Sequence, residues 1–177
     1  MKNHLILICL ALAALAAPNL RAADDILLAD FEGTNYGQWT ATGQAFGPGP
    51  ARGTLSGQMR VEGFQGKGLV NSFFQGDRST GTLTSPAFKI DRKFIRFLIG
   101  GGGFADKTCI NLLVAGKAVR TATGPNTIPG GSEALATASW DVSEFAGQTA
   151  QIQIVDKWEA FIPTDPTLAD LGLPQPQ

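Results

Sequence analysis

Residues 57–123 decide the fold, and they include GQMRVEGFQGKGLVNSFFQGD (57–77), TGTLTSPAF (80–88), FIRFLIGGGG (94–103) and TCINLLVAGKAVRTAT (108–123). Short apolar runs rich in β-branched and aromatic residues alternate with glycine-rich turns, a pattern typical of β-strands. The four glycines at 100–103 are not followed by the Lys-Ser or Lys-Thr pair of a phosphate-binding loop. These segments predict an all-β structure, and none of them matches a catalytic motif.

Roughly nine short strands are expected along the chain, at 26–31, 38–46, 67–74, 80–85, 87–90, 93–99, 108–114, 117–123 and 151–154. Ala115 and Gly116 are expected to form the turn of a hairpin. The 22 glycines disfavour long helices, and only a short turn is expected at 143–145. The predicted fold is a two-sheet antiparallel β-sandwich of jelly-roll, carbohydrate-binding-module-like type.

The first residues have the order of a secretory signal peptide: Lys2, an apolar run at 5–17, then Ala22 and Ala23. That run is shorter than the roughly 20 residues that span a bilayer. The expected organisation is a signal peptide at 1–23, a β-sandwich domain at 24–157 and a proline-rich, poorly ordered tail at 158–177. We expect a secreted or periplasmic protein with no membrane association after signal cleavage.

Charge and residue counts exclude several function classes. Lys and Arg number 14 against 15 Asp and Glu, so no basic excess favours nucleic acid. The sole histidine, His4, lies in the predicted leader, so the mature chain cannot build a histidine-activated nucleophile or an imidazole metal site. Cys109 would be the one cysteine left after cleavage, which excludes an intramolecular disulfide, and its apolar surroundings predict a buried, inert thiol.

Asp30 and Glu32 are the candidate ligands of a structural calcium ion. Two residues apart on one expected strand, both side chains would point to the same face, where carboxylates can share a hard cation. The alternative is that both are simply solvated. No cofactor is required by any motif in the chain.

Tyr36 and Trp39 are the candidate carbohydrate-binding residues. Aromatic rings stack on the apolar C–H faces of sugars, and these two rings lie close to a glycine-bearing turn. For Trp39 the stronger alternative is a half-buried core position. No catalytic residue is assigned, because a glycosidase needs two carboxylates at a defined separation that sequence alone does not give.

Several phrases together resemble a known family: DFEGTNYGQW (30–39), FGPGPARGTLSGQM (46–59), GFQGKGLVNSFFQGD (63–77), TGTLTSPAF (80–88), FLIGGGG (97–103), TCINLLVAGKAVRTATG (108–124) and SWDVSEFAGQTAQIQIVD (139–156). They are similar to the amino-terminal β-sandwich domain of secreted bacterial fructan hydrolases of glycoside hydrolase family 32, the levanase and fructanase group. In that family the domain precedes a catalytic β-propeller.

The family's catalytic motifs do not occur in this chain. The resemblance places the chemistry in Trp-Met-Asn-Asp-Pro, Arg-Asp-Pro and Glu-Cys strings of the propeller, whereas here Asp165-Pro166 follows Thr164. The resemblance therefore implies a non-catalytic accessory domain. Its expected role is fructan association or support of a fructan-hydrolase catalytic domain.

The resemblance also implies a missing strand. Similar domains continue into a Gly-His-Ile-Asn-Val-Asp-like final strand, but here Lys157 and the proline-rich tail follow Asp156. The sandwich is thus expected to lack its last strand, and we expect a truncated or frameshifted fragment of a longer fructanase. The alternative is a free-standing secreted lectin-like protein that binds a polysaccharide by itself.

Overall fold

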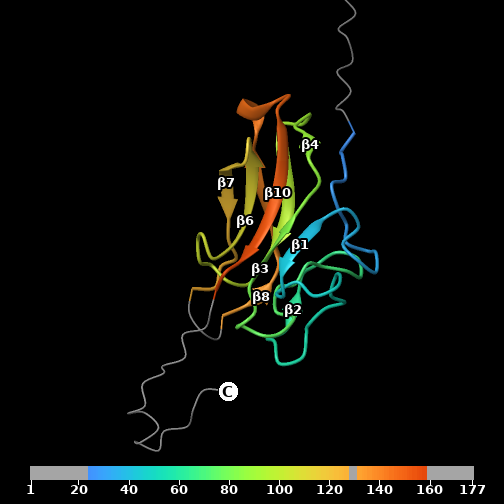
Figure 1. The fold of residues 1–177 in the computed structure, drawn as a ribbon, viewed down its shortest axis with the longest axis vertical. Helices are drawn as coiled ribbons and strands as arrows, with labels where there is room; N and C mark the ends of the chain where they lie inside the picture. Colours follow the sequence, from blue (N-terminus) through green and yellow to red (C-terminus); the bar gives the residue numbers. More distant parts are fainter. Residues whose placement is uncertain (1–23, 128–130, 159–177) are drawn as a thin grey trace, which may run out of the picture.

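A computed structural model describes residues 24–127 and 131–158 of the chain, and Figure 1 shows the fold. The strands are β1 (Thr40–Gly43), β2 (Val61–Glu62), β3 (Gly81–Thr84), β4 (Phe88–Lys89), β5 (Phe94–Ile99), β6 (Thr108–Val114), β7 (Lys117–Ala122), β8 (Glu133–Ala134), β9 (Ala136–Asp141) and β10 (Thr149–Asp156). A short 3₁₀ turn at Ser143–Phe145 precedes β10. Within the described ranges, no helix has the length and hydrophobicity needed to cross a bilayer.

The larger sheet has six strands in the order β1-β3-β10-β6-β7, with β4 also paired to β10. All of its pairings are antiparallel. Strand β10 holds the centre, because one edge pairs with β6 over Ala150–Asp156 while the other pairs with β3 and β4. Three strands of the larger sheet therefore pair with this one eight-residue segment.

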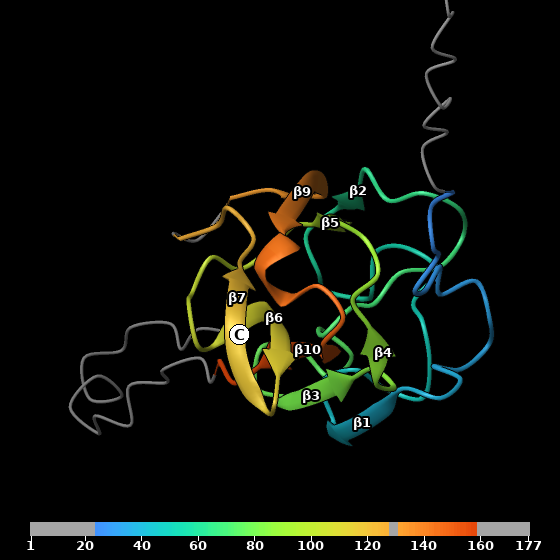
Figure 2. The ribbon, with the colours of Figure 1, turned by 90° about the horizontal axis from the view of Figure 1, so that it is seen from above.

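A smaller layer covers one face of this sheet. Strand β5 pairs with β9 antiparallel, and β2 pairs with β8 parallel over two residues. Seen from above in Figure 2, β5, β9 and β2 lie on the opposite side of the molecule from β1 and β3. The all-β sandwich is thus confirmed, and the finer jelly-roll assignment stays a prediction.

The core fills the space between the two layers. Leu112 and Val142 are fully buried in this core, and the ring centre of Trp140 lies 4.6 Å from that of Phe97. The cluster joins β6 and β10 from the larger sheet to β9 from the smaller one, and its buried members are Ile90, Leu112, Val114, Trp140, Val142, Ala150 and Ile152. Burial of these apolar side chains is the main term that stabilises such a fold.

The predicted hairpin is confirmed. Strands β6 and β7 meet across Ala115 (φ 49°) and Gly116 (φ 74°), which both adopt the left-handed conformation of a two-residue hairpin turn. Glycine takes this conformation at little cost, and Ala115 takes it at a penalty that the pairing of the two strands offsets. The expected strands at 80–85, 87–90, 93–99 and 151–154 are also confirmed, each within a few residues.

Two expected strands are wrong. Residues 26–31 form no strand, and Leu27 is 74% exposed; Arg92 instead bonds the carbonyl of Asp24 at 2.7 Å, and the chain turns at Phe31 (φ 57°). Residues 67–74 form only an isolated bridge between Leu69 and Ala51. Both segments contain apolar residues, but these residues do not pair into a sheet. The two segments run as loops instead.

The core position of Leu112 gives a stability prediction. Leu112→Ala should lower the free energy of unfolding by roughly 2–5 kcal/mol, because it leaves a cavity in a fully buried site. Leu113→Ala is the matched control, since Leu113 is the next residue on β6 and is only half-buried. Urea denaturation of both variants measures the difference, and equal losses would contradict the assigned facing of β6.

Candidate functional site

Asp30 and Glu32 lie in the amino-terminal segment that precedes β1, and they make different contacts. Asp30 accepts the backbone N–H of Glu32 at 3.1 Å. The Glu32 carboxylate accepts the N–H groups of Lys67 at 2.7 Å and Gly68 at 2.9 Å. These two bonds, with help from the charge of Arg52, lower the pKa of Glu32. Glu32 therefore fastens the amino-terminal segment to the 66–68 loop.

Arg52 is the neighbour that bears on a cation at this place. Its Nη2 atom donates to the carbonyl oxygens of Glu32 at 3.1 Å and Gly33 at 2.6 Å. The guanidinium thus already engages two carbonyl oxygens of the segment that carries Glu32. Among the described residues, no three His, Cys, Asp or Glu side chains gather into a metal site. Calcium ligation by Asp30 and Glu32 stays a prediction.

Tyr36 and Trp39 are brought together around the ring of Phe31. The centroid of Phe31 lies 6.2 Å from that of Tyr36 and 5.1 Å from that of Trp39, both edge to face. Tyr36 is only 8% exposed, its hydroxyl donates to the carbonyl of Phe46 at 2.8 Å, and burial raises its pKa to about 12. Trp39 is half-buried. The two rings form a small second core, and sugar contact by them stays a prediction.

The outer face of the larger sheet carries a row of uncharged polar side chains that sequence reasoning missed. Register places five residues side by side across five strands, namely Thr40, Thr84, Gln153, Asn111 and Thr121. Within this polar row, Thr121 donates to Asn111 at 2.7 Å and Gln153 donates to Thr84 at 3.3 Å. The signal available in sequence was the period-two alternation of β10, which turns Gln151 and Gln153 outward.

Cys109 and Val155 lie beside this row, on the same outer face. Cys109 is buried, as predicted, and burial raises the pKa of its thiol. A raised pKa keeps the thiol protonated near neutral pH, so it is a poor nucleophile.

Two partly buried carboxylates, Glu133 and Asp156, each lie close enough to Asp77 to be affected by its charge. Burial raises the pKa of both Glu133 and Asp156, and the charge of Asp77 adds to each shift. The rise in the pKa of Asp156 is partly offset by a hydrogen bond from the Ser72 side chain and by one from the backbone N–H of Trp158, at 3.1 Å. Desolvated carboxylates resemble the acids of glycosidases, but neither of the two hollows described next includes Glu133 or Asp156.

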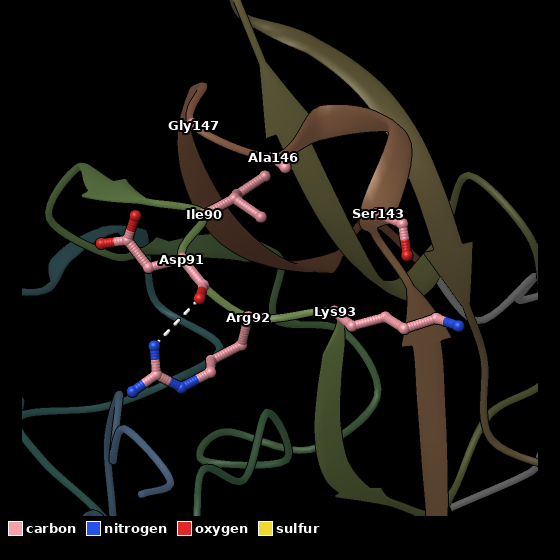
Figure 3. A pocket seen from close by; sticks show the side chains of 7 residues that line it. All are labelled: Ile90, Asp91, Arg92, Lys93, Ser143, Ala146 and Gly147. Atoms are coloured by element: carbon pink, nitrogen blue, oxygen red, sulfur yellow. Dashed lines mark hydrogen bonds between the residues drawn. The ribbon is translucent and has the colours of Figure 1, made fainter. Parts of the chain in front are cut away.

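A hollow of about 390 Å³ opens between the 90–93 loop and the turn before β10. Figure 3 shows Ile90 pointing toward Ala146, while the charged ends of Asp91, Arg92 and Lys93 point in three different directions. Arg92 is engaged with main-chain carbonyls, and Lys93 pairs with Asp141 at 3.8 Å. Because its charged groups diverge, this hollow does not concentrate polar groups on one ligand.

A second hollow of about 190 Å³ lies between the 46–55 loop and the 71–74 segment. Its walls are mostly apolar, and Asn71 is among the residues that line it. Tyr36 borders it indirectly, through its bond to the main chain of Phe46. Neither Tyr36 nor Trp39 is among the residues that line this second hollow.

A known protein is similar in sequence to most of this chain. The chain is 46% identical over 136 residues to the "Putative glycosyl hydrolase ecdE" of Aspergillus rugulosus. The match covers 75% of this chain and 19% of the relative, so the chain spans about a fifth of the length of the curated relative it matches. No protein-family model and no solved structure matches the chain. The chain is therefore an all-β sandwich that is similar in sequence to part of a longer protein named as a glycosyl hydrolase.

The predicted signal peptide at 1–23 and most of the predicted tail at 158–177 lie outside the described residues. Trp158 is the exception. Its ring stacks on Phe104 at 4.2 Å, and Lys107 lies 4.8 Å from the centre of the Trp158 ring. The start of the expected tail is thus held against the loop that precedes β6.

The raised pKa of Asp156 gives a pH prediction. The stabilisation linked to a raised carboxyl pKa is fully present below the pKa of the unfolded chain and is lost as the pH rises through the folded-state pKa. An ionised Asp156 therefore destabilises the folded state. Asp156→Asn keeps an oxygen for the Trp158 N–H and should raise Tm by about 1–3 °C at neutral pH.

The advantage of Asp156→Asn should shrink as the pH falls through the raised pKa of Asp156, because the wild-type carboxyl is then protonated in the folded chain. Asp25→Asn is the control, because Asp25 is exposed. Thermal unfolding followed by circular dichroism at several pH values measures both. A Tm gain that is independent of pH would show that burial does not raise the pKa of the Asp156 carboxyl.

Proposed function

We propose that this chain is a non-catalytic accessory domain that associates with fructan, similar to the amino-terminal sandwich of family 32 levanases and fructanases. The observation that carries the proposal is the 46% identity to one fifth of a glycosyl hydrolase, over 75% of this chain. A segment that is a minor share of a longer hydrolase, and that folds as a sandwich with its own core, fits an accessory role.

The surface chemistry supports a neutral polysaccharide as the partner. Fructans carry hydroxyl groups and no charge, and hydroxyl and amide side chains both donate and accept hydrogen bonds to such groups. The polar row on the larger sheet offers these side chains without a charged residue among its five members. A nucleic acid would instead require a basic surface, which the near-neutral balance of the chain disfavours.

The non-catalytic part of the proposal rests on the carboxylates that line the two hollows. Two carboxylates about 5 or 7–9 Å apart must flank the scissile bond in most glycosidases. Within 24–127 and 131–158, each hollow described above is lined by one carboxylate at most. The proposed role is therefore to hold substrate or to support a catalytic domain. Export from the cell, through the leader predicted at 1–23, belongs to the same proposal.

A binding and hydrolysis experiment tests this function. The purified chain should migrate more slowly in native gels that contain levan or inulin than in gels with the same amount of dextran. Incubation with either fructan should release no fructose above a buffer blank. Unchanged migration in both fructans would overturn the association, and steady release of fructose would overturn the non-catalytic assignment.

A structural calcium ion at Asp30 and Glu32 is a separate part of the proposal. Bound calcium stabilises the folded state by mass action, so Tm should be higher in calcium chloride than in EDTA. Glu32→Gln should remove that difference, because it removes one of the two carboxylates. Equal Tm values of the wild-type chain in both solutions would end the calcium proposal and leave fructan association untouched.

A further inference from the structure

The second hollow has the composition of a small sugar site. It encloses about 190 Å³ between two loops, and its walls come from Phe46, Pro48, Pro50, Leu55 and Phe74. No ionisable side chain is among the described residues that line it. Apolar walls with a few placed polar groups are typical of ligand sites, and the missing charge fits a neutral ligand.

Phe74 supplies an accessible aromatic ring. Its side chain is 47% exposed, although its backbone is fixed by a hydrogen bond from its N–H to the carbonyl of Ala45 at 3.0 Å. The ring rests on Gly47, where an added Cβ would lie 2.5 Å from a ring carbon. Gly47 also has φ +63°, which other residues rarely adopt. The ring is therefore held in place while part of it remains open to solvent.

Asn71 supplies a polar group whose orientation is fixed. Its Oδ1 accepts from the backbone N–H of Phe73 at 3.0 Å and from Gln58 Nε2 at 3.2 Å, and its Nδ2 donates to Gln58 Oε1 at 2.8 Å. Gln58 Oε1 in turn accepts the N–H of Leu55 at 3.1 Å. Because backbone N–H groups can only donate, both amide orientations are settled.

An amide nitrogen carries two N–H bonds, and this network engages one of the two on Asn71. Asn71 is 7% exposed and lines the hollow. Its remaining N–H has no partner among the described residues. A pre-oriented donor in an apolar recess is suited to the hydroxyl or ring oxygen of a sugar.

We propose that the second hollow binds one sugar unit of a neutral polysaccharide, with Phe74 stacking on the apolar face of the ring and Asn71 donating to one of its oxygens. This inference rests on the proposed function and gives that function a site. Sugar C–H groups pack on aromatic faces, and a rigid ring loses little entropy on binding. The volume suits one unit, so a longer chain would extend beyond the hollow.

Tyr36 then has a positioning role. Its hydroxyl holds the main chain of Phe46, which forms one wall of the second hollow. Gly49 packs against the carbonyl of Thr34, where a Cβ would lie only 2.4 Å from the oxygen. Thr34 and Tyr36, which precede β1, thereby set the shape of the 46–50 loop without touching the sugar itself.

The test compares two equally exposed phenylalanines. Phe74→Ala should weaken the affinity for inulin and levan roughly three- to tenfold, the range expected for loss of one ring stack. Phe94→Ala is the matched control, because Phe94 is 48% exposed on β5, outside the second hollow, and its affinity should stay unchanged. Phe74→Tyr should keep binding, which separates loss of the ring from loss of the fold.

A second readout follows Asn71 directly. In ¹⁵N-labelled wild-type protein, adding a short fructo-oligosaccharide should shift the side-chain NH₂ signal of Asn71 and leave that of Asn35 in place. If the wild type binds fructan and Phe74→Ala binds equally well, with an unmoved Asn71 signal, this site is wrong and the proposed function stands. If the wild type binds no fructan, the proposed function falls together with the site.

Discussion

The pairing of β10 with three other strands is the constraint on which the rest of the structure depends. One segment, Thr149–Asp156, provides backbone partners for β3, β4 and β6. Its alternation sends Ala150 and Ile152 into the core and Gln151 and Gln153 to the outer face. A shift of one residue would exchange these faces, so the register of β10 sets both the core and the polar row.

The smaller layer depends on that core for its position. Strands β5 and β9 pair only with each other among the described strands, and a two-stranded ribbon is marginal in water. Trp140 and Val142 anchor it by burying their side chains against β6 and β10. The loops that carry the second hollow are held by other means: the Glu32 carboxylate, the Tyr36 hydroxyl and the Gln58–Asn71 amide pair each satisfy main-chain or amide groups that no strand pairs.

Sequence patterns predicted the paired strands well and the loops poorly, for a physical reason. The apolar run at 108–114 and the alternation at 151–154 are visible locally, because core facing has a period of two. Residues 26–31 and 67–74 also contain apolar runs, yet whether they pair depends on distant partners. Gly68, for example, meets the carbonyl of Phe31 so closely that a Cβ would lie 2.0 Å from the oxygen. Such a contact cannot be deduced from either segment alone.

The aromatic residues show the same limit at the candidate site. Tyr36 and Trp39 were favoured from sequence because Tyr and Trp commonly contact sugars, but a side chain can stack on a ligand only if its ring remains accessible. Tyr36 is 8% exposed and bonds Phe46 within the second core, whereas Phe74 is 47% exposed. Packing decides how accessible each ring is, so residue type alone does not show which ring a ligand can reach.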